Sequence, residues 1–403
     1  MPHVVIVGAG PAGASLTHLL AHRGVEVTLL ERQRDFAREF RGEVLTPSGI
    51  DALGQIGVAD GIESLPAQEL DDIAMYMSRR LVFHEEIDFA ALGSSPPRAV
   101  SQPALLELLV AESAKSPHFR FERGVAAREL LLDRDRVVGV RAQTEDGPRD
   151  LRADLVIGAD GRGSSVRRHA DLPVHDLGQP MDVVWCKVPC PDDWTGARAY
   201  AGRGHLLIGY RTWDGTLQMG WVILKGTFGE LRARGVPQWI EEMAHHVTDD
   251  FAGHLRAHSD AVGHPFLLST AADCLERWSA PGLLAIGDAA HTMSPVGGQG
   301  INIALRDAIV AANHLVPVLT SPRLDDARLE AALRAIQQER MAEVAPIQRR
   351  QAQPPKVMMS HAWWGEPLRR GIAALLRRDF VRALAARQAQ AFLFGVTDAK
   401  LEV

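Results

Sequence analysis

Short apolar runs, a glycine-rich turn and a helical pattern follow one another at the start of the chain. Residues 3–7 are rich in β-branched side chains, which is typical of a buried parallel strand. Leucines recur at helical spacing over residues 14–22, Gly24 ends this pattern, and residues 25–30 repeat the buried-strand pattern. The N-terminal region is therefore predicted to be a strand–helix–strand unit.

The periodicity changes along the rest of the chain. Helical patterns cover residues 102–113 and 301–316, and strand patterns cover residues 119–125, 136–143, 153–158 and 282–286. Residues 181–224 instead alternate in a strand–turn–strand pattern rich in aromatic side chains, which indicates an antiparallel sheet. We expect an α/β fold with two domains and a helical C-terminal region. Residues 1–70, 98–178 and 277–350 would form a discontinuous Rossmann-type domain, 71–97 and 179–276 an inserted antiparallel-sheet domain, and 351–403 the C-terminal region.

Composition and charge narrow the class of protein. The chain has 403 residues, of which 46% are hydrophobic and 23% charged, so it can bury large cores. Its formal net charge of −6 offers no electrostatic basis for binding nucleic acid. The three cysteines (Cys186, Cys190 and Cys274) are too few for a disulfide framework and include no Cys-x-x-Cys pair, so no metal site is expected.

Targeting signals are also missing from the sequence pattern. No basic segment precedes the first apolar run, and no stretch approaches the roughly 18 apolar residues that a membrane-spanning helix needs. We therefore expect a cytoplasmic protein without integral membrane contact.

The strongest local motif is the glycine-rich turn after the first strand. It places Gly8, Gly10 and Gly13 in a G-x-G-x-x-G pattern that also contains Pro11 and Ala12. Such glycines allow a tight turn and close approach of the backbone to a pyrophosphate, which the N-terminus of the following helix attracts. Glu31 ends the second strand at the distance expected for a carboxylate on a ribose. The motif predicts a bound dinucleotide.

Two further motifs end predicted strands in short polar turns. Residues 154–161 end in Asp160–Gly161. Residues 282–291 contain Gly287–Asp288, and the chain continues through Pro295, Gly298, Gly300, Ile301 and Asn302 into the long helix.

Together the three motifs closely resemble the fingerprints of the single-component (group A) FAD-dependent aromatic hydroxylases related to p-hydroxybenzoate hydroxylase. The resemblance covers residues 1 to about 350 in the same order, and residues 41–45 resemble the family's Arg-Gly segment beside the flavin. It implies a Rossmann-type FAD-binding domain. It also implies that NADPH or NADH reduces FAD, that dioxygen then adds, and that a flavin hydroperoxide hydroxylates an aromatic or polycyclic small molecule.

The resemblance also implies roles for individual residues. Glu31 would hold the adenosine ribose, Asp288 the ribityl chain, and Arg41 and Gln102 would flank the flavin. The backbone at residues 300–302 would face the pyrimidine end of the ring, and the backbone at Pro295 its oxygen-reacting face. Asp160 would lie near the pyrophosphate and the nicotinamide cofactor, although an Asp-Gly pair is also a common turn former. The complete predicted cofactor site is Gly8, Gly10, Pro11, Ala12, Gly13, Glu31, Arg32, Arg41, Gln102, Val125, Asp160, Gly287, Asp288, Pro295, Gly298, Gly300, Ile301 and Asn302.

Substrate contacts are expected from the antiparallel sheet. The candidates are Tyr200, His205, Tyr210 and Trp221. Alternation separates Tyr210 from His205, but the pattern does not show which face lines the pocket. The chain has only three tyrosines, so the family's tyrosine network is not carried over and no acid–base residue is assigned.

Several alternatives share this fold. A flavin-dependent halogenase is disfavoured because residues 219–224 lack the first Trp and the Pro of a W-x-W-x-I-P motif. A non-catalytic flavoprotein is also disfavoured, because the complete loop from Gly287–Asp288 to Asn302 bears on the reactivity of the flavin ring. A reductase or epoxidase acting on a lipid-like substrate stays open. Homodimerisation is possible for the fold, but no residue pattern decides it.

The C-terminal region carries a basic amphipathic pattern. Its apolar stripe consists of Leu368, Ile372, Leu375, Leu376, Phe380 and Leu384. We expect this helix to dock on its own domain, with a membrane surface or a partner subunit as the alternative.

Overall fold

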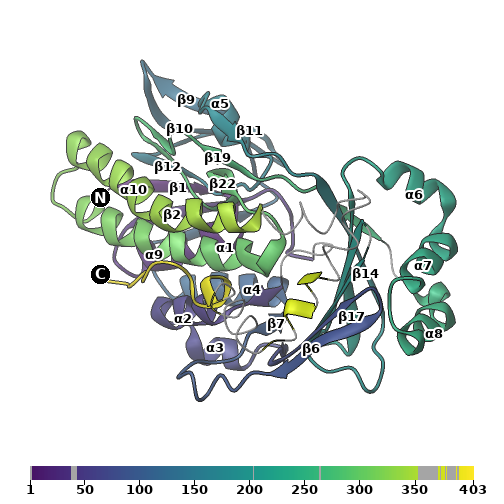
Figure 1. Ribbon diagram of the computed structural model, residues 1–403. Coiled ribbons are helices and arrows are strands. Elements are labelled where there is room, and N and C mark those ends of the chain that lie inside the picture. The colour runs from purple at the N-terminus through teal and green to yellow at the C-terminus, as the bar shows by residue number, and fades with distance from the viewer. Residues whose placement is uncertain are drawn as a thin grey trace.

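Two large sheets lie next to each other in the computed structural model of the chain (Figure 1). The structure describes residues 2–37, 43–202, 204–262, 265–352, 371–372, 374–376, 378, 387 and 390–403. Arg41 and several residues of the C-terminal stripe lie outside these ranges. The mixed α/β architecture confirms the predicted fold class.

The first sheet is built around the N-terminal strand β1 (His3–Val7), whose apolar residues are buried. Its order is β20-β21-β12-β1-β2-β8, and all neighbours are parallel except β20 and β21. The other strands are β2 (Glu26–Glu31), β8 (Phe119–Arg123), β12 (Leu155–Gly158), β20 (Ser279–Ala280) and β21 (Leu283–Ala285). Sheets of this kind bind ligands at the carboxyl ends of their strands.

Helices cover this parallel sheet (Figure 1). They are α1 (Pro11–Ala21), α4 (Gln102–Ser113), α9 (Gln299–Leu319) and α10 (Asp326–Gln351). Helix α1 packs against both α4 and α9, and α9 packs against α10. The predicted helix over residues 102–113 is confirmed at both ends, whereas the long helix extends beyond both ends of the predicted range.

The second sheet has seven strands in the order β18-β14-β17-β16-β15-β5-β6. Every pair is antiparallel except β15 with β5, so the antiparallel pattern expected over residues 181–224 is confirmed. The strands are β5 (Asp72–Met77), β6 (Arg80–Glu86), β14 (Met181–Pro189), β15 (Ala197–Gly202), β16 (His205–Arg211), β17 (Thr216–Leu224) and β18 (Phe266–Leu268).

The two faces of the seven-stranded sheet have different neighbours (Figure 1). One face packs under α6 (Phe228–Arg234), α7 (Val236–Ala244) and α8 (Asp249–Ala257), which with the 3-10 helix η1 (Ser259–Ala261) form one outer layer. The other face contacts Val44 and Val296, which belong to the part of the chain that carries the parallel sheet. This second face is therefore the one turned toward the predicted cofactor site.

Short antiparallel strand pairs lie where the chain crosses between the part with the parallel sheet and the part with the seven-stranded sheet. Strand β4 (Ala67–Glu69) pairs with β7 (Arg98–Val100), and β13 (Val174–Asp176) pairs with β19 (Asp273–Leu275). These pairs enclose residues 71–97 and most of 179–276, and the domain boundaries themselves stay a prediction. The remaining elements are β3 (Val44–Leu45), β9 (Ala126–Asp133), β10 (Arg136–Thr144), β11 (Gly147–Arg152), β22 (His291–Thr292), α2 (Pro47–Ile56), α3 (Ala59–Glu63), α5 (Ser165–His169) and the 3-10 helices η2 (Gly287–Ala289) and η3 (Val296–Gly298).

Two described members of the C-terminal stripe contact the chain's own second sheet. Ile372 and Leu376 pack against Met77, Val82 and Ala201. This contact supports docking on the chain's own domain, while Leu368, Phe380 and Leu384 lie outside the described residues. Within the ranges that the structure describes, no helix is both long enough and apolar enough to cross a bilayer.

Candidate cofactor and substrate site

The glycine-rich turn joins β1 to α1 with almost no free space on its inner side. Gly8 has a φ of +103°, and a Cβ there would lie 2.5 Å from the carbonyl oxygen of Ala159. A Cβ on Gly13 would lie 2.0 Å from the carbonyl oxygen of Gly8. A Cβ on Gly10, in contrast, would meet no atom within 4 Å, and Pro11 begins the helix. The turn therefore packs tightly against the protein but leaves the N-terminus of α1 open on the side where a phosphate would bind.

Glu31 is the last residue of β2, lies beside this turn and is only 3% exposed. Its carboxylate accepts hydrogen bonds from the backbone N–H of Ala9 at 3.1 Å and of Gln33 at 2.9 Å. Its carbonyl accepts from the N–H of Val125 at 2.9 Å, while the neighbouring Arg32 is exposed. The carboxylate is thus held in a fixed position at the carboxyl end of β2, and its contact with a ribose stays a prediction.

The Gly287–Asp288 motif lies against the start of α1. Gly287 has a φ of +59°, and a Cβ there would lie 3.0 Å from the Cβ of Ala12. The carboxylate of Asp288 accepts a hydrogen bond from the Nε of Arg162 at 3.1 Å. Two of the three motifs therefore meet at the carboxyl ends of the central strands. The sequence analysis did not single out Arg162, although it directly follows the Asp160–Gly161 turn.

Asp160 lies in the turn after β12, and its carboxylate binds the start of α5. It accepts from the Oγ of Ser164 at 2.5 Å and from the N–H of Ser165 at 2.7 Å. It also accepts from the N–H of Val166 at 3.3 Å. These bonds satisfy amide groups that the first turn of a helix otherwise leaves unpaired. Asp160 therefore has the structural role that an Asp-Gly turn former would have. Its contact with a cofactor stays a prediction.

The N-terminus of α9 is positioned by the fully buried side chain of Asn302. Its Oδ1 accepts from the N–H of Thr46 at 3.0 Å, and its Nδ2 donates to the carbonyls of Val44 at 3.2 Å and Gly298 at 2.9 Å. A Cβ on Gly300 would meet no atom within 4 Å. The helix start is therefore tied to β3 and α2 while its first turn stays open.

The other predicted flavin neighbours surround this helix start. Ile301 and Gln102 are buried, and Gln102 is the first residue of α4. Pro295 precedes η3, and the adjacent Val296 packs against the second sheet. Pro295 therefore belongs to the loop that joins β22 to α9 (residues 293–298, called the cofactor loop below) and lies where this loop meets the second sheet. Its catalytic role, and the role of Arg41 outside the described residues, stay predictions.

A buried network of charged residues is hydrogen-bonded to the turn at Gly287. The carboxylate of Asp307 accepts from the N–H of Gly287 at 3.0 Å, from the His291 ring at 2.7 Å and from the Nε of Arg340 at 2.7 Å. Although burial opposes ionisation, the charges and hydrogen bonds of His291 and Arg340 lower the pKa of Asp307 overall. Glu343 joins Arg340 to Arg306, which donates to the Thr397 carbonyl. The network links the cofactor turn to the C-terminal segment.

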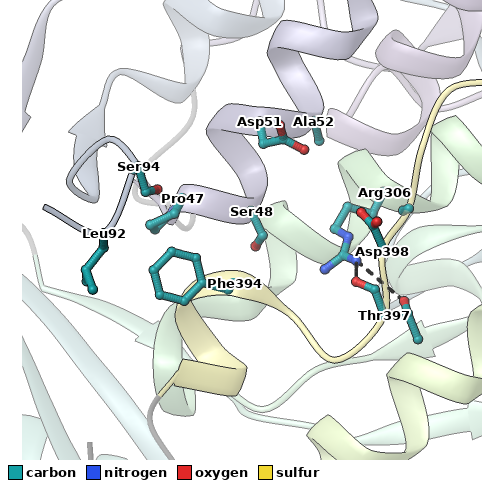
Figure 2. Close-up of a pocket in the computed structure, with 12 residues that line it drawn as sticks. Pro47, Ser48, Asp51, Ala52, Leu92, Ser94, Arg306, Phe394, Thr397 and Asp398 are labelled. Carbon is teal, nitrogen blue, oxygen red and sulfur yellow. Dashed lines mark hydrogen bonds between the residues drawn. The ribbon is translucent and has the colours of Figure 1, made fainter. Parts of the chain in front are cut away.

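Arg306 and Thr397 also line a cavity of about 240 Å³ between α2, the loop at residues 92–94 and the C-terminal segment. Figure 2 shows Phe394 on one side of this cavity and Pro47 and Leu92 across from it. None of its lining residues is among the predicted cofactor or substrate contacts.

The predicted substrate residues separate between the two faces of the seven-stranded sheet. Tyr200 and Trp221 belong to the core under α6–α8, where Trp221 stacks on Trp239 at 6.1 Å. The ring centroids of His205 and His246 are 3.2 Å apart. Substrate contact by these three residues stays a prediction.

Tyr210 alone of the four lies on the face toward the cofactor loop. It is buried, packs against Val44 and approaches Trp185 edge-on at 6.5 Å between ring centroids. The structure thus answers which face is turned toward the cofactor site.

One acidic residue of this region was not assigned by the sequence analysis. Glu43 precedes β3 and is only 7% exposed, and its Oε2 has no hydrogen-bond partner among the described residues. Burial raises the pKa of Glu43 to about 7, with opposing contributions from Lys187, which lowers it, and Asp214, which raises it. Burial and the nearby Glu43 raise the pKa of Tyr210 well above its usual value. The signal that could have identified Glu43 in the sequence is its position within residues 41–45, the segment that resembles the family's Arg-Gly segment beside the flavin.

Cysteine, histidine and acidic side chains do not cluster as a metal site anywhere in the described part of the chain. The candidate site therefore has two parts. One is formed by the glycines at the N-termini of α1 and α9, and the other is the sheet face that carries Tyr210.

Comparisons with known proteins agree with this geometry. Residues 1–342 match a protein family described as FAD binding domain. The 6-methylpretetramide 4-monooxygenase of Streptomyces rimosus is 32% identical over 352 residues, which cover 86% of this chain and 83% of that protein.

Solved structures share the whole fold. The p-nitrophenol 4-monooxygenase PnpA of Pseudomonas putida DLL-E4 superimposes with a TM-score of 0.78 at 19% identity, covering 99% of this chain and 100% of that one. PqsL of P. aeruginosa, solved in complex with 2-aminobenzoylacetate, gives a TM-score of 0.76 at 22% identity, covering 93% and 98%. At these identities the two structures establish a common fold.

Proposed function

The chain belongs to the FAD-binding-domain family of single-component monooxygenases, and from that premise we propose that it hydroxylates an aromatic or polycyclic small molecule. The reaction would use NADPH or NADH and dioxygen. One substrate C–H bond, dioxygen, the reduced nicotinamide and a proton give a hydroxylated product, water and the oxidised nicotinamide. Bound FAD supplies the redox chemistry of this reaction.

One observation supports the proposal most: the loop before α9, which is predicted to face the flavin, contacts an aromatic face of the second sheet. Gly10 and Gly300 leave open space at two helix N-termini, while Glu31 is held at the end of β2. Tyr210 and Trp185 lie on the sheet face that contacts the loop leading into α9. An elongated nucleotide and an aromatic molecule would thus be bound next to each other.

The residues of this chain have separable tasks in that arrangement. The N-termini of α1 and α9 would stabilise negative charge, first on the pyrophosphate and then on the reduced ring. Glu31 would bind the ribose hydroxyls, and Asp288 the ribityl chain. The apolar contacts between Val296 and the second sheet would keep water away from the reacting atoms.

The test is product formation by the purified, FAD-loaded protein. We would supply NADPH or NADH, ¹⁸O₂ and each of three hydroxyaromatic compounds: phenol, 1-naphthol and 1-hydroxyanthraquinone. The expected result is a product that carries one ¹⁸O atom and forms only when nicotinamide, oxygen and aromatic compound are all present. Mass spectrometry detects it, and oxygen consumption measures its coupling to nicotinamide oxidation.

A different result would separate the alternatives. Flavin reduction by the nicotinamide without ¹⁸O in any compound of the panel would overturn the proposal in favour of a reductase. Failure to bind FAD would overturn the cofactor assignment itself.

A further inference from the structure

Glu43 lies at the junction between the cofactor loop and the second sheet, with its backbone firmly held. Its carbonyl accepts a hydrogen bond from the N–H of Val100 at 2.8 Å. The next residue, Val44, packs against Tyr210, and its carbonyl accepts a hydrogen bond from Asn302 at the start of α9. The carboxyl of Glu43 thus lies near Tyr210 and Lys187 of the aromatic sheet face.

The buried side chain of Glu43 is incompletely satisfied in the described part of the chain, where its Oε2 finds no hydrogen-bond partner. Leaving a buried polar atom unpaired costs about 1–3 kcal/mol, and native proteins contain few such atoms. The carboxyl of Glu43 therefore offers a free acceptor atom to a hydrogen-bond donor of a bound molecule.

Three polar side chains form a row on the facing sheet. Lys187 of β14 pairs with Gln218 of β17, which pairs with Tyr210 of β16. Alternation places all three on the face toward the cofactor loop, because Leu217 and Met219 belong to the core on the other side. Gln218 is 1% exposed and donates from Nε2 to the carbonyl of Cys186 at 3.2 Å.

The Oε1 of Gln218 is a second buried oxygen without a hydrogen-bond partner among the described residues. Both unpaired atoms are oxygens, so the ligand that completes them must offer a hydrogen-bond donor. A hydroxyl group on an aromatic ring meets this requirement and suits the neighbouring Trp185 and Tyr210.

The charges around Glu43 allow it to exchange a proton near neutral pH. Lys187 is paired with Asp214 at 2.7 Å and lies over the Trp213 ring at 5.2 Å. Lys187, Asp214 and Tyr210 are the facing groups that interact electrostatically with Glu43. The resulting pKa of about 7 suits a general base at neutral pH.

We propose that the substrate is a hydroxyaromatic compound whose hydroxyl proton is accepted by Glu43 Oε2, with Gln218 and Tyr210 orienting that hydroxyl. The substrate O–H bond breaks, a new O–H bond forms on Glu43, and the electron pair stays on the substrate oxygen. The more electron-rich ring is then the better acceptor of the oxygen atom. The proton returns to the product oxygen. This inference rests on the proposed function.

The experiment compares Glu43→Gln, Glu43→Asp and the wild-type protein on the panel compound that the wild type hydroxylates. The matched control is Glu63→Gln, because Glu63 carries an exposed carboxylate that pairs with Arg98. Each FAD-loaded protein is assayed for kcat from about pH 5 to about pH 9. FAD content and the rate of anaerobic flavin reduction by the nicotinamide are measured in parallel.

The wild-type kcat is expected to rise with pH and to level off above about pH 7, since Glu43 accepts a proton only when ionised. Glu43→Gln is expected to lose about 100-fold at the plateau and the pH dependence with it, while it keeps FAD. Glu43→Asp should regain part of the rate and the pH dependence. Glu63→Gln should behave as the wild type.

Two results would overturn the inference while leaving the proposed function intact. One is a Glu43→Gln protein that keeps the wild-type rate and pH profile. The other is loss of FAD from Glu43→Gln together with a Glu43→Asp protein whose pH profile is unchanged in shape and rate, because Glu43 would then serve structure alone. If the wild type hydroxylates no compound of the panel, the proposed function fails and the inference fails with it.

Discussion

The two faces of the seven-stranded sheet differ in the kinds of side chains that they carry. The face under α6–α8 forms one continuous core of large apolar side chains, including Trp194, Trp221, Trp239 and Phe251. The face toward the cofactor loop is divided into small apolar clusters and carries the polar side chains of Gln218 and Tyr210, with Glu43 nearby on the segment before β3.

This difference separates stability from chemistry within a single sheet. Close-packed apolar groups stabilise a fold, whereas buried polar groups without hydrogen bonds reduce its stability and can bind a ligand instead. Substitutions on the two faces should therefore produce opposite combinations of effects on unfolding free energy and on turnover.

The largest stability effect is expected on the helix-covered face. Trp221→Ala removes a ring that stacks on Trp239 and should lower the unfolding free energy by about 3–5 kcal/mol. Thermal unfolding of the FAD-loaded protein measures this loss. At temperatures where the variant stays folded, the turnover per folded molecule should change little. A strong fall in turnover of the folded variant would instead place Trp221 in the substrate site.

Glu43→Gln should have the opposite effect on stability. The pKa of Glu43 is about 7 in the folded protein against 4.5 for the free group, so folding favours the protonated form. Its contribution to stability is present at low pH and is lost as the pH rises from about 4.5 to about 7. Replacement by the neutral amide should therefore stabilise the protein at pH 8 by on the order of 3 kcal/mol.

Denaturant unfolding at pH 8 and pH 5 checks this expectation. The difference between Glu43→Gln and wild type should shrink toward pH 5, while Glu63→Gln should show no comparable gain at either pH. A Glu43→Gln protein less stable than wild type at pH 8 would contradict the expected cost of the buried charge.

The motifs and the order of elements could be predicted from the sequence because they depend on local patterns. The turn from Gly8 to Gly13 and the helix α4 follow directly from residue spacing. The role of each sheet face could not be predicted, because alternation separates Tyr210 from Trp221 without showing which side the helices cover. Pairings between distant segments, such as Arg162 with Asp288, likewise leave no periodic signal.

The buried charges of the long helices were hidden for a similar reason. Asp307 and Arg340 lie in helical sequences where charged residues usually face solvent, and both are at most 1% exposed. Only the packing of α9 on α10 brings them together and buries them. Tertiary contacts therefore decide which polar residues are structural, which explains why no acid–base residue could be assigned beforehand.

The tyrosines on opposite faces provide a matched pair. Tyr210→Phe removes a hydroxyl from the face toward the cofactor and should lower kcat about 10-fold, which corresponds to about 1.4 kcal/mol. Tyr200→Phe removes one from the helix-covered core and should leave kcat within about two-fold, since Tyr200 packs against Phe251 and Tyr76. Steady-state kinetics on the hydroxylated panel compound measures both. Equal losses in the two variants would remove the functional distinction between the faces.

The smallest expected effect is a shift in the pH dependence of kcat when Asp214, the ion-pair partner of Lys187, is replaced. Asp214→Asn removes a negative charge that raises the pKa of Glu43 and frees Lys187, whose positive charge lowers it. Both changes favour the ionised carboxyl, so the rise of kcat with pH should move to lower pH by less than about one unit, or about 1.4 kcal/mol. Asp150→Asn, on the distant strand β11, is the control. A shift to higher pH would mean that Glu43 does not control the pH dependence, because both electrostatic changes act on its carboxyl in the same direction.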